Sequence, residues 1–528
     1  MTARPRAVAL LGAALALTLA ACAPTEASSD GTPDAAGTSG TTVDTDTIRV
    51  TVDVPATFDP GAAQSLPDFV LARMSYDTLV RRDDSGLVPG LAASWESDHS
   101  SATFTLRDGL TCADGTPLTA SVVKDSLDYM ASSPAAIVNA GQVFGTNVPA
   151  IVADDDAGTV SITLDSPWPD MVTGLAMAAA GIVCPTGLAD PEGLATGAVD
   201  GAQSGPYLLE SAEPGVRYVY SLRDDYDAWP EWTSDVAGAP AETLEFVISL
   251  DSSATANLVL SDELDMGHIQ PPTIERFDSE PDFDINTFPF SDTYVIFNER
   301  DSSPFADQAA RAAVAQAIDR DAFNQVTTLG LGEVTPGLTT LAAQCPAPSE
   351  DAVIAYDAAA ASEVLSGMTI RMIGPNIVGD NGSGNEYIAE ALRAAGATVE
   401  LNNTDVGTWI STLYTDWTSW DMTIYADLNF LGSHTSAVDT FLGAPFEEGG
   451  TNLGAVSNPD AEDAFAAFLN APTDEESCAA LNSSVEALVS NADTIPLVNS
   501  PFTYVERPGF TVYNLGSALD DPIYRIDN

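Results

Sequence analysis

Residues 294–323 read YVIFNERDSSPFADQAARAAVAQAIDRDAF, and this stretch places a strand pattern directly before a helix pattern. Residues 293–298 are rich in β-branched and aromatic side chains, which is typical of a strand. Over 306–320 the small and apolar residues recur at helical spacing and form one stripe opposite Asp307, Arg311 and Gln316. The stripe consists of Ala310, Ala313, Val314, Ala317 and Ile318. This change of period predicts an α/β protein rather than a barrel of strands alone.

The same alternation continues along the rest of the chain. Further candidate strands are 102–107, 216–222, 245–250 and 398–401. Residues 386–395 have a helical pattern that stops at Gly396, where glycine favours the end of a helix. With 528 residues, the chain is long enough to predict two or three structural regions rather than one core.

The amino-terminal segment resembles a bacterial lipoprotein signal peptide. Arg4 and Arg6 precede an apolar run over 7–20 without an acidic residue, and Cys22 follows Leu19-Ala20-Ala21. We therefore expect a signal peptide over 1–21 and Cys22 as the lipid anchor of the mature protein. An ordinary secretory signal, with a cysteine that falls near the cleavage site, is the alternative. The expected location is the extracellular face of the cell membrane, or the periplasm if an outer membrane is present.

The segment that follows has the composition of a flexible tether. Residues 22–44 are rich in Ala, Ser, Thr, Gly and Pro, and they carry too few large apolar side chains to form a core. From about residue 45 onward, the chain has the apolar content of a globular protein. The tether would hold that globular part away from the membrane.

The charge of the chain excludes several classes of partner. Its 77 acidic residues outnumber its 18 lysines and arginines, and the formal net charge is −59. A surface of this sign repels nucleic acids and anionic lipid. We therefore expect no nucleic-acid partner, and membrane association only through the lipid anchor.

Few residues could carry catalytic or metal chemistry. The three histidines, His99, His268 and His434, form no metal-binding pair, and no Gly-x-Ser-x-Gly nucleophile elbow occurs. Four cysteines remain after Cys22, at spacings that fit no zinc site. In an exported protein they predict two disulfides, for which three pairings are possible. We expect the protein to bind neither a metal nor a cofactor and not to be an enzyme. A secreted hydrolase is the less favoured alternative.

Several segments in a fixed order resemble one known family. They include Thr57-Phe58-Asp59-Pro60 and the stretch LVPGLAASWESDHSSATFTLRDGLTCADGTPLTASVV over 87–123. The resemblance continues through SGPYLL (204–209), DELDMG (262–267), the stretch over 294–323, Tyr356-Asp357, AEALRAAGATVEL (389–401), Asp421-Met422 and Ile495-Pro496-Leu497. Together these pieces resemble the family 5 extracellular solute-binding proteins, which are receptors of peptide and nickel ABC importers.

The resemblance implies a periplasmic-binding-protein-like α/β fold of the large, three-subdomain, oligopeptide-binding type, with a hinge between two lobes. The core of lobe I would combine 45–79, 205–287 and 495–528, a subdomain of that lobe would span 80–204, and lobe II would span 288–494. On these boundaries the disulfides pair Cys112 with Cys184 and Cys345 with Cys478, because each pair then stays within one region.

The resemblance also implies a function and partners. The protein would be a monomeric receptor that captures a small solute, foremost a peptide, between its lobes and delivers it to the permease of an ABC importer. A sensor of a solute or signalling peptide with the same fold is an alternative that the sequence leaves open. Sugars and metal complexes are alternative ligands, although His434 is the only histidine near the expected site.

Asp427 is the leading candidate for a ligand contact. In peptide-binding relatives, an aspartate after the matching Asp-Met step holds the α-ammonium group of the ligand. Asp427 follows Asp421-Met422 sooner than in those relatives, and an ungapped alignment would place Phe430 at that position. The alternative role for Asp427 is a surface or capping carboxylate. The further candidate ligand-binding residues are Tyr425, Phe430, Asn429, His434, Trp409, Phe58 and Tyr294.

Overall fold

The structure is a computed structural model that describes residues 46–249, 251–340, 345–428, 430–517 and 519–527. The predicted signal peptide, Cys22, the tether and Asn429 therefore lie outside the described residues. Within the described ranges, none of the helices combines the length and the apolar character that a membrane crossing requires.

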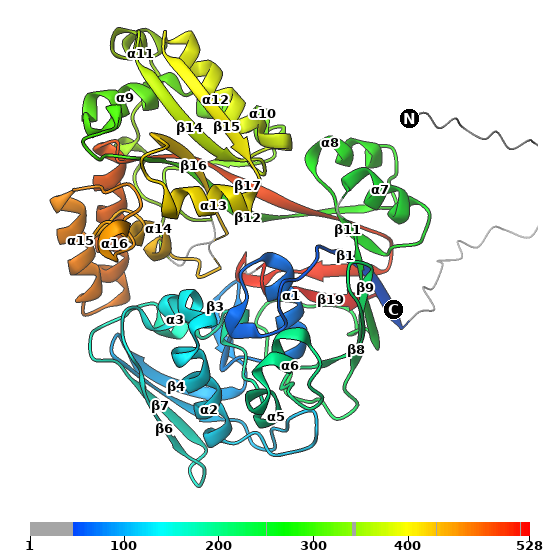
Figure 1. The fold of residues 1–528 in the computed structure, drawn as a ribbon. Helices are drawn as coiled ribbons and strands as arrows, with labels where there is room; N and C mark the ends of the chain where they lie inside the picture. Colours follow the sequence, from blue (N-terminus) through cyan, green and yellow to red (C-terminus); the bar gives the residue numbers. More distant parts are fainter. Residues whose placement is uncertain (1–45, 250, 341–344, 429, 518, 528) are drawn as a thin grey trace, which may run out of the picture. The chain divides into compact units, whose positions relative to one another are not determined.

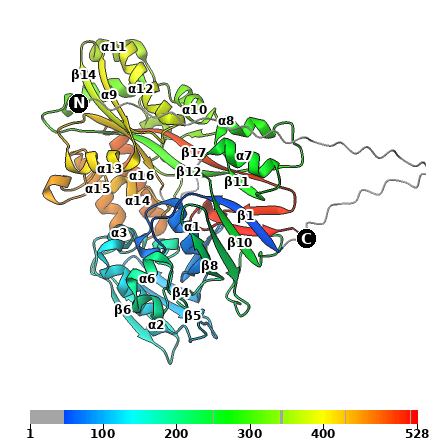
Figure 2. The same cartoon turned by 45° about the vertical axis from the view of Figure 1, so that its right-hand side comes forward.

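One large mixed sheet contains eleven of the strands, in the order β15-β14-β16-β12-β17-β11-β1-β10-β9-β8, with β13 paired to β17 beside this path. Figure 1 labels β14 and β15 at one end of this sheet and β8 and β9 at the other, and Figure 2 shows the same sheet turned, with β14 and β8 labelled. Its strands are β1 (Thr47–Val52), β8 (Tyr207–Glu213), β9 (Arg217–Leu222), β10 (Thr243–Ile248), β11 (Met266–His268), β12 (Asp284–Phe297), β13 (Glu333–Val334), β14 (Thr369–Pro375), β15 (Thr398–Thr404), β16 (Met422–Asp427) and β17 (Thr494–Glu506). Every strand predicted from the pattern within this sheet is present, with ends shifted by up to three residues, except that the strand predicted over 293–298 begins nine residues earlier, at Asp284.

The strands β12 and β17 hold the middle of this sheet together. They pair antiparallel from Asp284 opposite Glu506 to Ile296 opposite Thr494 (Figure 1). The pairing shifts register between Pro289 and Ser291, next to the point where Pro289 faces Pro501. Proline has no amide hydrogen to donate, so the ladder of hydrogen bonds is interrupted there. A second register shift follows between Thr293 and Tyr294, so two long strands with two irregularities connect the two halves of the sheet.

A separate four-stranded antiparallel sheet forms in the amino-terminal third of the chain. It has the order β4-β5-β7-β6, with β4 at Ala92–Asp98, β5 at Ser101–Leu106, β6 at Ala150–Asp154 and β7 at Thr159–Thr163. In β5 the side chains alternate as the sequence predicts, with Phe104 buried and Thr103 exposed. Helix α2 (Ala120–Ser132) packs against β6 and β7. Two short hairpins complete the strands, β2 (Val80–Asp83) with β3 (Gly86–Pro89) and β18 (Phe510–Tyr513) with β19 (Ile523–Ile526).

The helices lie mostly in the connections between strands. The remaining helices are α1 (Leu66–Ser75), α3 (Ile137–Phe144), α4 (Met171–Gly174), α5 (Pro185–Ala189), α6 (Pro191–Thr196), α7 (Ser252–Leu260), α8 (Pro271–Ile274), α9 (Gln308–Ala317), α10 (Arg320–Thr328), α11 (Ala358–Leu365), α12 (Ser383–Ala394), α13 (Val406–Thr415), α14 (Thr435–Asp439), α15 (Pro459–Leu469) and α16 (Asp474–Ser490).

The helix predicted over 306–320 was wrong at both ends. Asp307 caps α9 by accepting a hydrogen bond from the amide of Ala309 at 3.0 Å, so that helix starts at Gln308. Ile318 has an extended backbone, with φ −99° and ψ 115°, and ends it. Asp319 then caps α10 through the amide of Ala322 at 3.1 Å. Capping by Asp307 and the extended backbone of Ile318 thus shorten the expected helix to Gln308–Ala317, and Asp319 starts a second helix at Arg320.

The two faces of β12 belong to different cores, which decides where its side chains point. Val295 and Phe297 pack with the residues of α9, α10 and α12. Tyr294 and Ile296 pack on the opposite side with Trp409 of α13, Phe441 and residues of α16. Because side chains alternate along a strand, Asp292 shares the face of Tyr294 and Ile296.

Both predicted disulfides are present. Cys112 pairs with Cys184, whose Cα atoms lie 6.1 Å apart, and Cys345 pairs with Cys478 at a Cα separation of 5.2 Å. The first links the segment after β5 to the start of α5, and the second links the segment before α11 to α16. The pairing that follows from the family resemblance is therefore confirmed.

Candidate ligand-binding site

The register between β12 and β16 brings two carboxylates side by side. Asp292 lies opposite Asp427, and Tyr294 lies opposite Tyr425. Directly opposite residues on neighbouring antiparallel strands present their side chains to the same face, with Cβ atoms about 5 Å apart. Asn499 of β17 lies opposite Asp292 on its other side. We call Asp427, Asp292 and Asn499 the acidic row.

Asp292 is the most unusual member of the acidic row. It is 0% exposed, and neither of its carboxylate oxygens has a hydrogen-bond partner among the described residues. Burial raises the pKa of Asp292 well above the usual range, and the charge of Asp427 raises it further, while the amide of Thr293 acts in the opposite direction. Burial of an ionised carboxyl group is costly without a counter-charge, so Asp292 favours its protonated form.

Aromatic side chains surround the acidic row on its strand face. The ring of Tyr425 lies 5.6 Å from that of Tyr294 and 5.2 Å from that of Trp409, measured between centroids. Trp409 is buried and donates its indole N–H to Thr423 Oγ1 at 2.9 Å. Burial, followed by nearby charges that include Asp427, raises the pKa of both Tyr294 and Tyr425 well above the usual value. Asp427, Tyr425, Tyr294 and Trp409, four of the predicted site residues, thus come together.

Phe430 follows the acidic row in sequence but packs elsewhere. Its ring centroid lies 4.4 Å from that of Phe69 in α1. Arg82 of β2 donates hydrogen bonds to the carbonyl oxygens of Phe430 and of Leu431, the latter at 3.1 Å. Gly432, next in the chain, has φ +67°, a conformation that favours glycine. The segment after β16 is therefore fixed against residues that lie more than 300 positions earlier in the chain.

His434 is held inside the protein by the backbone. It is buried, and its Nδ1 accepts a hydrogen bond from the amide of Leu338 at 3.2 Å. Burial lowers its pKa to about 4, so the imidazole is neutral near pH 7. Among the described residues there is no group of three or more His, Cys, Asp or Glu side chains that could hold a metal ion.

Phe58, another predicted site residue, does not join the acidic row. Its ring packs edge-on against Tyr218 of β9 at 5.5 Å, and its amide donates to Ala195 O at 3.0 Å. These contacts place Phe58 in the core formed by β1, β9 and β10. Its neighbour in the sequence, Asp59, accepts a hydrogen bond from the amide of Gly61 and so caps the short helical turn at Pro60–Ala62. The motif Thr57-Phe58-Asp59-Pro60 therefore has a structural role.

Sequence reasoning missed Asp292 and Asn499. A signal for Asp292 is present, because a charged residue stands two positions before Tyr294, in the alternation that continues through Ile296. Asn499 offers a weaker signal, since asparagine within a strand has many structural explanations. Only the pairing of β12 with both β16 and β17 brings these residues into one row.

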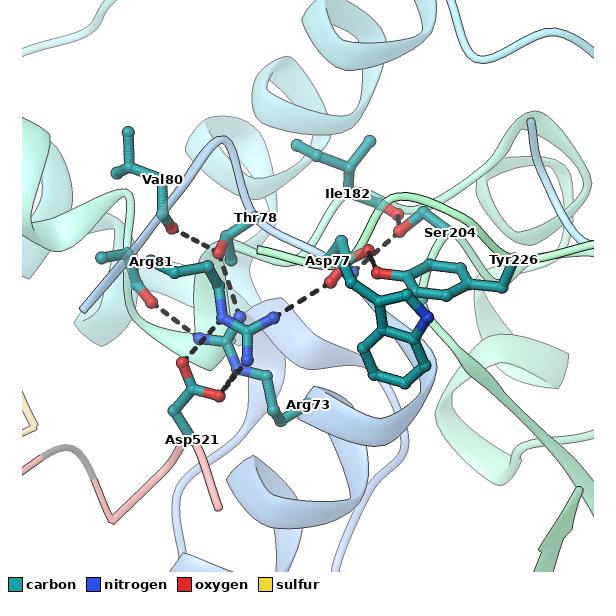
Figure 3. Close-up of polar contacts among 12 residues, drawn as sticks. Arg73, Asp77, Thr78, Val80, Arg81, Ile182, Ser204, Tyr226 and Asp521 are labelled. Atoms are coloured by element: carbon teal, nitrogen blue, oxygen red, sulfur yellow. Dashed lines mark hydrogen bonds and ion pairs between the residues drawn. The ribbon is translucent and has the colours of Figure 1, made fainter. Parts of the chain in front are cut away.

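A second buried cluster of charged residues lies around β2 and the carboxyl-terminal segment, and we call it the arginine network (Figure 3). Arg81 forms ion pairs with Asp521 and with Asp77, the latter at 3.2 Å, and Arg73 Nε lies 3.4 Å from Asp521. Arg73 also donates to Thr78 Oγ1 at 3.0 Å and to Ala176 O at 2.7 Å. Tyr226 donates its hydroxyl hydrogen to Asp77.

A small pocket beside the arginine network does not have the features of a solute site. Its lining includes Tyr226, Trp229, Trp232 and Arg525. Arg525 lies over the Trp229 ring at 5.4 Å, and Arg81 lies over the Trp232 ring at 5.1 Å. The guanidinium groups and aromatic rings of this pocket contact one another, so we interpret it as packing around β19.

The comparisons with known proteins identify the family. Residues 86–447 match the profile of the bacterial extracellular solute-binding proteins, family 5. The chain belongs to this family. A substrate-binding protein from Microbacterium hydrocarbonoxydans, whose crystal structure contains 4-hydroxybenzoate hydrazide, is 46% identical, with a TM-score of 0.81 over 91% of this chain and 100% of that one.

Other family 5 proteins support the fold. The periplasmic murein peptide-binding protein MppA of Escherichia coli is 29% identical over 326 residues, which cover 57% of this chain and 59% of that protein. OppA of Haemophilus influenzae, solved in complex with the peptide RPPGFSPFR, is 16% identical with a TM-score of 0.71 over 92% of this chain and 99% of that one. The predicted two-lobed α/β fold of family 5 binding proteins is confirmed. The chain spans about half the length, or less, of the curated relatives it matches.

Proposed function

We propose that this family 5 protein is the solute-binding receptor of an ABC importer, and that it captures a small solute, foremost a peptide, for delivery to a membrane permease. The observation that carries the proposal is the cross-strand pair of Asp427 and Asp292 among aromatic side chains on β12 and β16. Proteins that bind amphipathic solutes use a few polar groups within a largely aromatic and apolar lining.

In this proposal, Asp427 accepts hydrogen bonds from the amino end of the solute. Tyr425, which is only partly buried, lies beside it and can contact the solute directly. Trp409 and Tyr294 pack against the ring of Tyr425, so the proposal assigns them the role of positioning that ring. His434, Phe430 and Phe58 have structural contacts of their own, so the proposal gives them no direct role.

The lobes would have the boundaries that the sequence suggests: 45–79, 205–287 and 495–528 for the core of lobe I, 80–204 for its subdomain, and 288–494 for lobe II. One change of lobe then falls within β12, beside Pro289, and the other falls at the start of β17, between Thr494 and Ile495. Each disulfide stays within one lobe or subdomain. Neither would restrain a hinge motion around the solute.

The receptor would act outside the cell as a monomer, attached by lipid at Cys22 and by the tether over 22–44. Family 5 members are transport receptors, and we extend this to the present chain, which would bind its solute without converting it. A sensor that passes the bound state to another protein would use the same site. Loss of solute uptake on deletion of a neighbouring permease would favour import over sensing.

A second solute class is favoured by one relative. The Microbacterium hydrocarbonoxydans protein, at 46% identity, was crystallised with 4-hydroxybenzoate hydrazide. This hydrazide has a terminal nitrogen and an aromatic ring, and both suit a carboxylate beside tyrosine side chains. A small aromatic hydrazide is therefore the alternative to a peptide.

A thermal-shift assay tests this proposal, because a solute that binds only the native state raises the melting temperature. The purified protein is heated with trialanine, 4-hydroxybenzoate hydrazide, maltotriose or a nickel–histidine complex. We expect trialanine or the hydrazide to raise the melting temperature. We also expect both solutes to remain chemically unchanged after incubation with the protein. A shift with maltotriose or the nickel complex alone would contradict the assigned solute class, and conversion of trialanine would contradict a receptor role.

A further inference from the structure

The geometry of Asp292 sets the acidic row apart from an ordinary surface cluster of acids. Its carboxyl group is fully buried, and both oxygens lack a hydrogen-bond partner among the described residues. Its cross-strand neighbour, Asp427, is a second carboxylate. On the other side, Asn499 has a buried Oδ1 atom that also lacks a partner within the described part of the chain. Two of the three residues in this row therefore have hydrogen-bonding capacity that the protein does not use.

The charges around Asp292 are all negative or neutral. The titratable groups that face it are Asp427 on β16, the hydroxyl of Tyr294 on its own strand and, beyond these, Tyr425. No arginine, lysine or histidine forms an ion pair with Asp292 in the described ranges. If Asp292 ionised, it would have no counter-charge of its own and would face the carboxyl group of Asp427, so ionisation is costly and Asp292 retains its proton.

We propose that protonated Asp292 and ionised Asp427 act together to recognise a headgroup in which a terminal nitrogen is separated by one atom from an acyl carbon. Asp427 accepts hydrogen bonds from the terminal N–H groups, and the Asp292 O–H donates to the acyl oxygen. This inference rests on the proposed function, and it adds the chemical class of the headgroup and a specificity-determining residue.

Both candidate solutes fit this description. In a peptide, the α-nitrogen, the α-carbon and the first carbonyl carbon follow one another. In an acyl hydrazide, the terminal nitrogen, the second nitrogen and the carbonyl carbon do the same. A row with one charged acceptor and one neutral donor matches both, whereas two ionised carboxylates would repel the acyl oxygen. Binding then neither takes up nor releases a proton, because Asp292 keeps its hydrogen throughout.

Two substitutions separate the donor role of Asp292 from a charge role. Asp292→Asn has the same shape and still donates a hydrogen bond, whereas Asp292→Leu has a similar volume and cannot. Isothermal titration calorimetry with trialanine and with 4-hydroxybenzoate hydrazide measures affinity for both variants and for wild type.

Asp125→Asn on α2, an exposed position, is the matched control. N-acetyl-trialanine and 4-hydroxybenzamide, in which no terminal nitrogen is separated by one atom from an acyl carbon, are the control solutes. Thermal melting without solute shows that each variant is folded.

We expect Asp292→Leu to weaken binding by about tenfold or more, and Asp292→Asn by no more than about threefold. Titrations in phosphate and in Tris at pH 7 should give the same binding enthalpy. Equal enthalpies in buffers of different ionisation enthalpy mean that binding exchanges no proton with the solvent. Equal losses in both variants, together with release of about one proton per solute, would show that Asp292 ionises and would overturn the inference. Wild-type affinity in Asp292→Leu would overturn it as well, while leaving the receptor proposal intact. Failure of wild type to bind either probe would instead remove both proposals.

Discussion

The arginine network and the acidic row are both buried and both contain aspartates, yet they treat an aspartate in opposite ways. Asp521 in the arginine network forms ion pairs with Arg73 and Arg81 (Figure 3). Asp292 in the acidic row has neither an ion pair nor a hydrogen bond among the described residues. Each of the two carboxyl groups is at most 5% exposed.

The pKa shifts of these two residues follow their neighbours. Burial alone would raise the pKa of Asp521, but the charges of Arg73 and Arg81 outweigh burial and hold the pKa below its usual value. Burial raises the pKa of Asp292, and the charge of Asp427 adds to this effect. Burial by itself therefore does not indicate whether an aspartate is structural or binds a ligand. A buried acid with its cations present stabilises the fold, whereas a buried acid without them is a candidate for binding.

The largest effect should come from breaking the arginine network. Asp521→Ala leaves Arg73 and Arg81 buried with one fewer carboxylate, and we expect the free energy of unfolding to fall by about 3–5 kcal/mol. Urea denaturation followed by circular dichroism measures the change. Glu213→Ala, which removes a partner of the exposed Arg217, is the control and should give a change too small to resolve. Equal effects of the two substitutions would contradict a structural role for the network.

Within the acidic row, removing the charge of Asp427 should affect binding rather than folding. Asp427→Asn abolishes the charged acceptor for the terminal nitrogen, and we expect affinity for trialanine to fall about 100-fold. Calorimetry gives the affinity, and the melting temperature without solute should stay close to that of wild type. Unchanged affinity would remove Asp427 from the site.

The pH dependence of stability should reveal the buried acid of the row. The folded-state pKa of Asp292 is raised above its unfolded value, so its contribution to stability is full below the ordinary carboxyl pKa of about 4 and is lost as pH rises toward the folded-state pKa. Asp292→Asn removes this loss. We therefore expect the unfolding free energy of Asp292→Asn, relative to that of wild type, to increase with rising pH by up to about 1.4 kcal/mol per pH unit. Parallel pH profiles for the two proteins would contradict a raised pKa at Asp292.

Substitution of Arg82, which lies between the arginine network and the acidic row, should have the smallest effect on binding. It donates to the carbonyl oxygens of Phe430 and Leu431, just after the strand that carries Asp427. Nη2 of Arg82 donates both hydrogen bonds. Arg82→Lys keeps the charge but replaces the planar guanidinium, which holds this nitrogen in place, by a freely rotating ammonium, and we expect about fivefold weaker binding of trialanine. Calorimetry measures the affinity, and Arg217→Lys at an exposed position is the control. Equal affinities of Arg82→Lys and wild type would show that this contact does not support the site.

Much of the fold could be predicted because local patterns determine local elements. The alternation in β5 and the turn chemistry around Cys112 depend on neighbours in the chain, and so does the helix that ends before Gly396. The one clear error, a single helix over 306–320, arose because apolar spacing continues past Ile318 while Asp319 caps a new helix. The disulfide pairing followed from the family resemblance and was confirmed.

Residue patterns in the chain were enough to predict the alternation of strands and helices, the acidic surface and membership of the family 5 solute-binding proteins. They also directed attention to Asp427. The tertiary structure alone decided which side chains stand beside Asp427, because β12, β16 and β17 come from segments more than 60 residues apart and their register is fixed by long-range hydrogen bonds. That register places Asp292 between Asp427 and Asn499, and it leaves Phe430, His434 and Phe58 in contacts of their own. A carboxylate's neighbours determine its pKa and its role, and those neighbours are set by the pairing of strands rather than by proximity in the chain.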